Sequence, residues 1–468
     1  MFVRRFALSA AGIVSRPRLG VFVMALALSA VGFNAIATAQ TAQHIGTAKD
    51  PGVRGGPAGA GSPIAGLNGY EMAFFSSGQA NFALLDSVSG AVAGTGSGLG
   101  PRYNAEGCAQ CHAHPALGGS SPAVNPQVAA ANDQGAANQI PPFIAANGPV
   151  REARFPYSMD LRSVDGGVHA LFTITGRTDA PGCNLTQPDF ALAAARNNLV
   201  FRIPTPAFGG GLIEAITDAT IRANQQNNLS QKRALGIGGR PNISGNDGSI
   251  SRFGWKAQNN SLEIFSGEAY NVEVGATNEL FAAERDQTPA CQFNATPEDH
   301  MNYEMDGTSQ PSDVVRFTVF MRMLDQPQPG PSSTSTQRGN QLFAQVGCAL
   351  CHTPSFTTGN STVAALGSVK ANLYSDLLLH HMGPTLADNI VQGTAGGDEY
   401  RTAPLWGLGQ RLFFLHDGRT SDLVRAIQMH ASPGNGSYRG SEANGVVNGY
   451  NRLSQSDQQH LLNFLRSL

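Results

Sequence analysis

Two short motifs constrain this 468-residue chain more than any other feature. Both read Cys-x-x-Cys-His, and they comprise Cys108, Cys111 and His112, then Cys348, Cys351 and His352. Two thiols on one helical turn reach the two vinyl groups of a haem, and the adjacent imidazole then faces the iron. Zinc would require further Cys or His ligands nearby, which the remaining pattern does not provide. The sequence therefore predicts two covalently bound c-type haems, with His112 and His352 as iron ligands.

The N-terminus predicts export. Four arginines and no acidic residue precede position 40, residues 19–33 are apolar, and Ala37-Thr38-Ala39 offers a small-x-small cleavage site. A retained membrane anchor is the alternative, but the apolar run is short for a span and lacks a stop-transfer flank. We expect residues 1–39 to be a cleaved signal peptide. The mature protein is then periplasmic, with no stable membrane span.

The net charge excludes one class of partner. The formal charge of the whole chain is −2, and removing the four leader arginines gives −2 − 4 = −6. Nucleic-acid binding requires concentrated Lys and Arg, and the mature chain has no basic cluster. We expect no nucleic-acid partner.

Two of the six cysteines, Cys183 and Cys291, lie outside the motifs. In an oxidising compartment two such thiols favour a pair over two free groups. We expect a Cys183–Cys291 disulfide that closes a long loop and stabilises an insertion. A free reactive thiol is the alternative.

The predicted fold is mainly α, with two cytochrome c-like haem domains, the first enlarged by a loop-rich insertion. Residues 115–200 show little helical periodicity and supply that insertion, whereas the Pro-rich run after residue 326 is typical of a linker. The expected segments are a signal peptide (1–39), a flexible lead-in (40–65), an N-terminal haem domain (66–325), a linker (326–336) and a C-terminal cytochrome c domain (337–468).

Helical spacing is clearest in four places. We expect helices over 70–85, over 313–324 with Ser312 as N-cap, over 338–343, and from Ser454 to the C-terminus. A short helix and a glycine precede each motif, which indicates a weak internal duplication.

The second ligand of each iron decides the function, since an iron with two protein ligands passes electrons and an open iron binds a small oxidant. The C-terminal candidates are His380, His381, Met382, His416, Met429 and His430. Residues 421–430 look helical, which places His430 on the buried face with Leu423 and Ile427. We prefer His430, and residues 380–382 are its main competitor.

Four blocks of sequence resemble the bacterial di-haem oxidoreductases, a family of peroxidases and thiol oxidoreductases. The blocks are residues 98–104 (GLGPRYN), 252–257 (RFGWKA), 377–388 (LLLHHMGPTLAD) and 401–419 (RTAPLWGLGQRLFFLHDGR). More distantly, the chain is similar to di-haem cytochrome c peroxidases and to the di-haem enzymes of methylamine utilisation.

The wider resemblance implies roles for several residues. The peroxidases have a His-Asp-Gly segment, matched by His416-Asp417-Gly418, and fourteen residues later a methionine ligand, where this chain has His430. The resemblance thus implies a bis-histidine C-terminal haem with a lower potential than a His/Met haem. It also implies that Trp255 lies between the haems, and that Glu273 is the acid that helps to cleave peroxide.

The chain departs from the peroxidases at three places. Phe265 replaces a glutamine ten residues after the tryptophan, and no histidine corresponds to the one that blocks the resting N-terminal haem. Arg411 and Phe413 replace the Thr and Pro next to a bound calcium, so calcium is doubtful.

These observations predict a periplasmic di-haem c-type oxidoreductase that is peroxidase-like. The N-terminal haem would be open and catalytic, with Glu273 as general acid–base, and the C-terminal haem would relay electrons through Trp255. The expected partners are a small peroxide-like oxidant or a thiol substrate, and a periplasmic electron donor or acceptor. If His114 or His169 closed the first iron, the protein would instead be a pure electron carrier. Oxygen or organic-radical chemistry, or oxidation of a bound thiol, is a third hypothesis.

Overall fold

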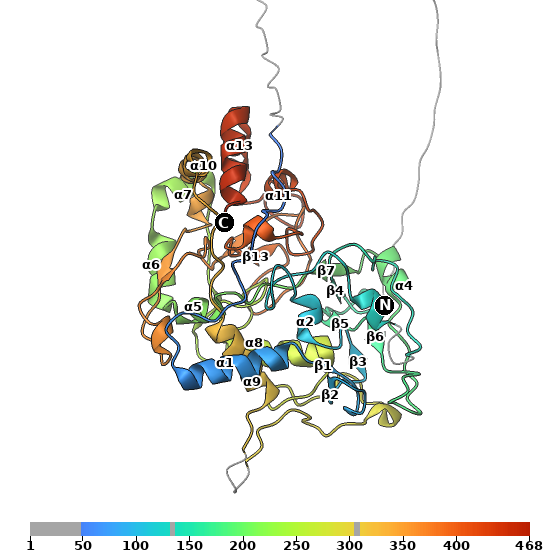
Figure 1. Cartoon of the computed structure of the whole chain (residues 1–468). Helices are drawn as coiled ribbons and strands as arrows, with labels where there is room; N and C mark the ends of the chain where they lie inside the picture. The colour runs from blue at the N-terminus through green and yellow to red at the C-terminus, as the bar shows by residue number, and fades with distance from the viewer. Residues whose placement is uncertain (1–47, 132–135, 304–308) are drawn as a thin grey trace, which may run out of the picture. The chain divides into compact units, whose positions relative to one another are not determined.

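The computed structural model describes residues 48–131, 136–303 and 309–468, and these belong to one compact unit, Ile45–Leu468 (Figure 1). The predicted signal peptide lies outside the described residues. Helical residues make up 30% and strand residues 12%. The predicted separation into two haem domains at residues 326–336 stays a prediction. Pro327 is buried there, and the backbone amides of Gln328 and Gly330 donate to Gly59 and Ser467.

The helices and strands are short and separated by long irregular segments. The helices are α1 (Gly69–Phe82), α2 (Cys108–Cys111), α3 (Gln127–Ala130), α4 (Phe190–Ala195), α5 (Gly210–Ala215), α6 (Asp218–Gln226), α7 (Leu229–Leu235), α8 (Leu262–Ala269), α9 (Asp313–Met323), α10 (Thr334–Gln345), α11 (Leu423–Met429), α12 (Asn444–Asn451) and α13 (Gln455–Leu465). The strands are β1 (Leu85–Asp86), β2 (Thr95–Gly96), β3 (Arg102–Tyr103), β4 (Glu152–Arg154), β5 (Val168–His169), β6 (Phe172–Thr173), β7 (Val200–Arg202), β8 (Asn242–Ile243), β9 (Ile250–Ser251), β10 (Phe356–Thr357), β11 (Lys370–Ala371), β12 (Leu379–His381) and β13 (Glu399–Arg401).

The strands form small antiparallel pairs rather than a central sheet, apart from the parallel pair β1–β2. The largest sheet has the order β5-β4-β7 and pairs Ala153 with both His169 and Phe201. Strands β12 and β13 pair His380 with Tyr400. Strand β13 ends at Arg401, which lines the cavity of the second motif. The expected loop-rich insertion therefore contains short strands and few helices.

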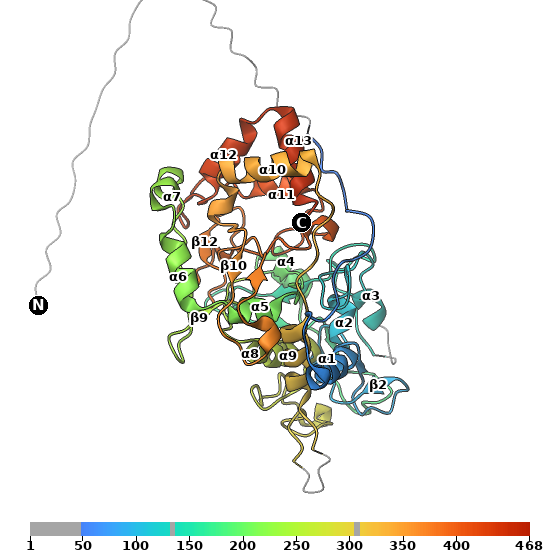
Figure 2. The ribbon, with the colours of Figure 1, turned by 60° about the vertical axis from the view of Figure 1, so that its left-hand side comes forward.

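Two helix pairs stand beside the two motifs, α1 with α9 and α10 with α13 (Figures 1 and 2). Each pair crosses at a glycine. A Cβ on Gly78 of α1 would lie 2.4 Å from the Arg316 carbonyl oxygen, and one on Gly339 of α10 would lie 2.0 Å from that of His460. Only glycine permits such close backbones. The shared arrangement agrees with the predicted duplication.

The predicted helix ends are confirmed where they depend on caps. The Ser312 side chain accepts from the Val315 amide at the start of α9, and Ser454 accepts from the Asp457 amide at the start of α13. An N-cap oxygen satisfies an amide that has no partner within the helix. The predicted Cys183–Cys291 disulfide is also confirmed. No helix in the described ranges is long and apolar enough to cross a bilayer.

Residues 48–65, which belong to the predicted flexible lead-in, make several long-range contacts. The Asp50 carboxylate accepts two hydrogen bonds from Arg466, at 2.8 and 2.7 Å, and the Arg54 amide donates to Gly409. Ile64 is buried, and its amide donates to Met323. Composition suggested a flexible segment because Gly and Pro are frequent, but long-range contacts hold this one in place. Residues 40–47 lie outside the described residues.

Asp50→Asn should lower the free energy of unfolding by about 2 kcal/mol at pH 7, because it leaves the buried Arg466 without its countercharge. Burial alone would raise the pKa of Asp50, but hydrogen bonds from Arg466 and from the Gly52 and Leu423 amides outweigh it and lower that pKa. The stabilisation is therefore present above the ordinary carboxyl range and is lost as the pH falls through the folded pKa.

Urea unfolding from pH 7 to pH 3 measures the difference. Asp457→Asn, which breaks the exposed pair to Arg338, is the control and should cost less than about 1 kcal/mol. Equal losses from the two variants would contradict the role given to Asp50.

Candidate haem-binding sites

The first motif lies on a single helical turn, α2, at the wall of a large cavity. Cys108 and Cys111 stand three residues apart on this turn, and His112 directly follows it as the C-cap. The His112 Nδ1–H donates to the Gly119 carbonyl at 3.0 Å. A neutral imidazole that donates through Nδ1 keeps its lone pair on Nε2, which is the usual arrangement of a metal-binding histidine.

The second motif repeats this geometry. Cys348 opens a 3-10 turn, Cys348–Leu350, and Cys351 directly follows it. The His352 Nδ1–H donates to the Tyr374 carbonyl at 3.0 Å, again leaving Nε2 as the ligand atom. The same backbone device thus holds both predicted iron ligands.

Burial keeps both imidazoles neutral. It lowers the pKa of His112 to about 4, against a smaller opposing effect of the Gly119 and Thr205 carbonyls. Burial also lowers the pKa of His352 to about 4, helped by the neighbouring His430. A neutral ring is the form that binds a metal.

The two cavities fit the predicted cofactor. The empty space in them is about 1210 and 1440 Å³, open mouths included. Each presents the two thiols and the neutral imidazole of its motif, the donor set of a covalently attached haem. Cys108, Cys111, His112, Cys348, Cys351 and His352 would hold the two haems.

His430 lies in the C-terminal cavity together with His352. It follows α11, and its Nδ1–H donates to the Ala426 carbonyl at 2.7 Å. Leu423 and Ile427 line the same cavity, as the predicted helical face requires. His430 therefore shares the anchoring of His112 and His352.

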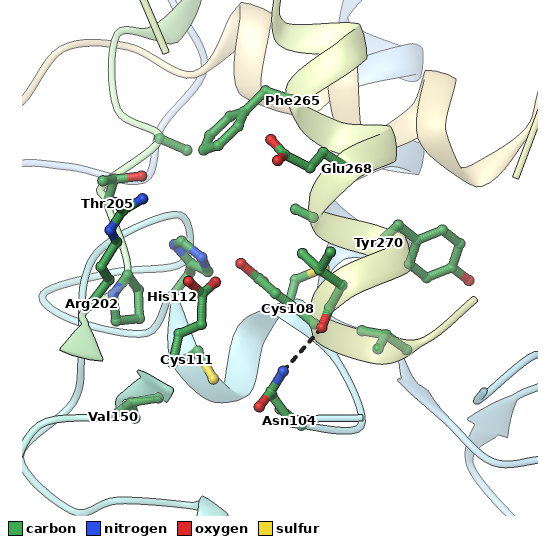
Figure 3. A pocket seen from close by; sticks show the side chains of 18 of the residues that line it. Asn104, Cys108, Cys111, His112, Val150, Arg202, Thr205, Phe265, Glu268 and Tyr270 are labelled. Carbon is green, nitrogen blue, oxygen red and sulfur yellow. Dashed lines mark hydrogen bonds between the residues drawn. The ribbon is translucent and has the colours of Figure 1, made fainter. Parts of the chain in front are cut away.

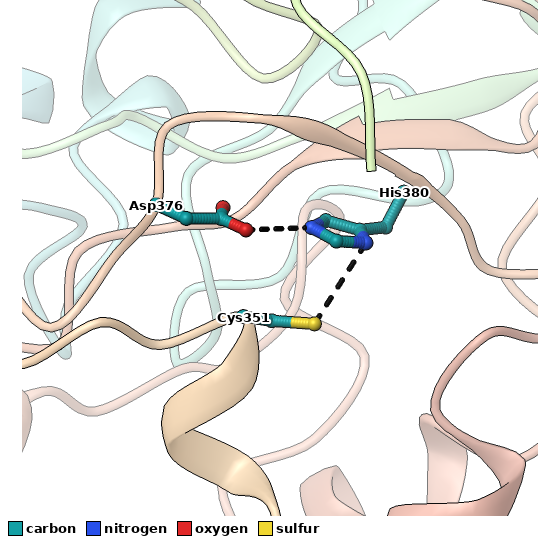
Figure 4. A group of neighbouring side chains, drawn as sticks. All are labelled: Cys351, Asp376 and His380. Atoms are coloured by element: carbon teal, nitrogen blue, oxygen red, sulfur yellow. Dashed lines mark hydrogen bonds and ion pairs between the residues drawn. The ribbon is translucent and has the colours of Figure 1, made fainter. Parts of the chain in front are cut away.

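The competing histidines have no free nitrogen. His380 sits between two carboxylates, with Nδ1 2.8 Å from Glu442 and Nε2 2.9 Å from Asp376; Figure 4 shows it beside Asp376 and Cys351. His381 contacts Asp398 through Nδ1 at 3.0 Å and Glu399 through Nε2 at 3.2 Å. An imidazole with both nitrogens against carboxylates is a double donor and offers no lone pair to iron.

Of the other candidates, Met429 does not line this cavity, whereas Met382 and His416 do. The His416 ring stacks on Tyr400 with centroids 4.4 Å apart, and its Nε2 lies 3.3 Å from the Tyr400 hydroxyl. His416 thus belongs to a packed aromatic wall, which includes the edge of Trp255 at 6.4 Å.

The N-terminal cavity has a different second wall. Within the described residues, His112 is the only histidine that lines it, and the carboxylates of Glu152, Glu268 and Glu273 line it as well. His114 is held elsewhere, with Nε2 2.7 Å from the Gln410 carbonyl. His169 stacks on Phe155 and pairs with Asp165. Neither His114 nor His169, the two candidates for a second ligand of the first iron, lines this cavity.

Glu273 lies on a π-helical turn, Tyr270–Val274, that continues α8. Residues 98–104 hold this turn in place: the Asn104 amide donates to the Glu273 carbonyl at 2.7 Å, and the Gly100 amide donates to Val274 at 3.2 Å. A Cβ on Gly100 would lie 2.1 Å from the Gly275 carbonyl oxygen, so the two backbones touch. The Gly-rich block before the first motif therefore positions Glu273.

Burial in the cavity raises the pKa of Glu273 to about 8, helped by Glu152 and Glu268 and opposed by Arg154. Its carboxyl thus changes protonation near neutral pH, where a proton-transferring group is most effective.

The sequence did not predict two polar groups of this cavity, Glu268 and Gln258. Glu268 accepts a hydrogen bond from Asn259, and Figure 3 shows it on α8 with Phe265, facing the cavity that His112 lines. Gln258 has a buried side-chain oxygen without a partner among the described residues. The five-residue step from Glu268 to Glu273 fits a π-turn rather than an α-helix, so regular helical spacing gave no signal for it.

Trp255 lines both haem cavities and a third cavity of about 590 Å³. Its Nε1–H donates to the Ile203 carbonyl at 2.9 Å, and its carbonyl accepts from the Arg401 amide at 2.9 Å. Trp255 thus contributes to the walls of both cavities, and its position between two haems stays a prediction.

A family model described as "Di-haem oxidoreductase, putative peroxidase" matches residues 168–468. The chain belongs to this family. No curated protein matches this di-haem oxidoreductase.

Similar solved structures include a MauG-like protein associated with microbial copper homeostasis, at 16% identity and a TM-score of 0.29, covering 57% of this chain and 90% of that one. The di-haem peroxidase BthA from Burkholderia thailandensis E264 matches at 12% identity and a TM-score of 0.28, covering 57% and 86%. Hydrazine synthase from Kuenenia stuttgartiensis matches at 17% identity and a TM-score of 0.22, covering 34% and 56%.

Glu273→Gln should slow the reaction with hydrogen peroxide by about 10²–10⁴-fold. It should also abolish a rise of that rate up to about pH 8, because the carboxylate must be unprotonated to accept the first proton and burial raises its pKa to about 8. Stopped-flow absorbance of the haem-loaded protein measures the rate. Glu263→Gln, on the exposed side of α8, is the control and should keep the wild-type profile. An unchanged profile in Glu273→Gln together with its loss in Glu268→Gln would transfer the role to Glu268.

Proposed function

We propose that this di-haem oxidoreductase is a periplasmic, peroxidase-like c-type enzyme with an open N-terminal haem and a bis-histidine C-terminal haem. The asymmetry of the two cavities carries the proposal. The C-terminal cavity holds a second imidazole anchored through Nδ1, whereas the N-terminal cavity, in its described part, holds three carboxylates and no second histidine.

In the N-terminal cavity the bound haem would supply an iron able to bind and reduce a small oxidant of the peroxide class. Glu273 would accept the proton of one peroxide oxygen and donate it to the departing oxygen. Reducing one peroxide to two waters consumes two electrons and two protons, so an external donor must supply the electrons.

In the C-terminal cavity His352 and His430 would bind the second haem, whose two nitrogen ligands give it a lower potential than His/Met ligation. Trp255 would carry electrons between the cavities, since its ring contributes to the walls of both. The donor would be a periplasmic redox partner. A thiol substrate is the alternative that the resemblance to thiol oxidoreductases implies.

Export and covalent attachment are part of the same proposal, because c-type haem is attached to reduced thiols after export. Mass spectrometry of the periplasmic protein should give a chain that begins at Gln40 and carries two haems. Replacing Cys108 and Cys111 by Ala should remove one of them. A cytoplasmic chain that keeps residues 1–39 would contradict the proposed location.

The oxidised protein should give one high-spin and one low-spin EPR signal. His430→Ala should convert the low-spin signal, because the C-terminal iron loses its second ligand, and should leave the N-terminal signal unchanged. His460→Ala is the matched control, since His460 lies on α13, is hydrogen-bonded to Ser335 of α10, and lines neither cavity.

Two low-spin signals that do not respond to cyanide or peroxide would contradict the enzyme and indicate an electron carrier. Met321 is the one methionine of the described chain that lines the N-terminal cavity. If its sulfur closed the first iron, Met321→Leu would turn one of those two signals high-spin.

A further inference from the structure

Two arginines on the wall between the cavities have no ion-pair partner in the described part of the chain. Arg401 and Arg411 line both the C-terminal haem cavity and the third cavity beside Trp255. Arg401 is 8% exposed; its Nε–H donates to the Gly254 carbonyl at 3.0 Å, and one Nη contacts the Thr402 carbonyl at 3.5 Å. The Arg411 side chain donates no hydrogen bond to any described residue. Among the described residues, no carboxylate forms an ion pair with either.

Other buried arginines of this protein show what is missing. Arg177 contacts Glu106 at 2.7 Å, Arg202 contacts Asp388 at 2.7 Å, and Arg466 contacts Asp50 at 2.7 Å. A buried cation without such a partner costs several kcal/mol. Arg401 and Arg411 therefore lack the negative group that these three arginines have.

The two guanidinium groups also act on each other. Burial lowers the pKa of Arg401 to about 10, and the charge of Arg411 contributes to this shift. Burial likewise lowers the pKa of Arg411 to about 10. Both groups remain cations at neutral pH, so two like charges lie close together in a low-dielectric wall. An anion between them would relieve the repulsion and the desolvation together.

The shape of the site selects the class of anion. A guanidinium group presents a planar fork that matches the two oxygens of a carboxylate. The third cavity is otherwise largely aromatic and apolar, with Trp255, Trp406 and Phe253 in its lining, and its other cation, Arg252, is already paired with Asp218. The ligand is thus a carboxylate carried by an apolar or aromatic body.

We propose that Arg401 and Arg411 form a carboxylate-binding site, and that the propionate side chains of the C-terminal haem occupy it. The inference rests on haem in this cavity, and it does not require peroxidase activity. The Arg401 side chain also donates to the Gly254 carbonyl, and its main-chain amide donates to the Trp255 carbonyl. The site would therefore connect the haem carboxylates to the segment that carries Trp255.

The test uses haem-loaded Arg411→Gln and Arg411→Lys. Arg425→Gln is the matched control, because it removes the same charge from the exposed side of α11, the helix that precedes His430. Pyridine haemochrome counts the haems in each variant, resonance Raman spectra report the propionate bending bands, and redox titration gives the midpoint potential of each haem. Titration with sodium formate tests for a diffusible carboxylate.

We expect two haems in every variant, shifted propionate bands in both Arg411 variants, and no response of the wild type to formate. Loss of a nearby positive charge disfavours the reduced haem, so Arg411→Gln should lower the reduction equilibrium constant of the C-terminal haem about tenfold relative to Arg425→Gln. A tenfold change is about 59 mV for one electron. Arg411→Lys keeps the charge and should stay within about twofold of the wild type, and it provides the test if Arg411→Gln does not fold.

The wild type could instead show a saturable formate response that disappears in Arg411→Gln, with unchanged propionate bands. That result would support a carboxylate site but would show that its occupant is a diffusible carboxylate and not a haem propionate. Propionate bands, potential and formate response that all match the wild type in both Arg411 variants would overturn the proposal. A haem count of one in the wild type would contradict the di-haem proposal instead, so the two failures are distinguishable.

Discussion

The hydrogen bond from a histidine Nδ1 to a backbone carbonyl is the interaction on which both proposed sites depend. His112, His352 and His430 each donate to a carbonyl, from Gly119, Tyr374 and Ala426. This contact fixes the tautomer and the ring plane before any metal arrives. The acceptors belong to loops or to the neighbouring helical turn, so the irregular parts of the chain determine where the iron ligands point.

The residues opposite each motif explain how two similar motifs could serve different purposes. One cavity is lined by a second anchored imidazole. The other is lined by carboxylates, and there burial, helped by the charges of Glu152 and Glu268, raises the pKa of Glu273. Trp255 contacts both, and its position depends on backbone hydrogen bonds from Arg401 and on its own bond to Ile203. The proposed division of function thus depends on the residues opposite each motif and not on the motifs themselves.

Local features of the sequence predicted the local features of the fold. The motifs, the caps at Ser312 and Ser454, and the two leftover cysteines each act over short range or by elimination, and their predictions are confirmed where the structure tests them. Contacts between distant segments gave no such signal. Only knowledge of which segments meet would have predicted three features of the structure. These are the contact of Asp50 with Arg466, the cavity position of Glu268, and the convergence of Arg401 and Arg411.

The contact between Gly100 and Gly275 has a mechanical consequence. The segment that begins at Gly100 continues through Asn104, whose amide donates to the Glu273 carbonyl, and reaches Cys108 four residues later. Two main chains in direct contact leave no flexible side chain to absorb a displacement. Any shift of the first motif that accompanies a change of oxidation state would therefore move the acid with it, so that the proton carrier and the cofactor travel as one rigid piece.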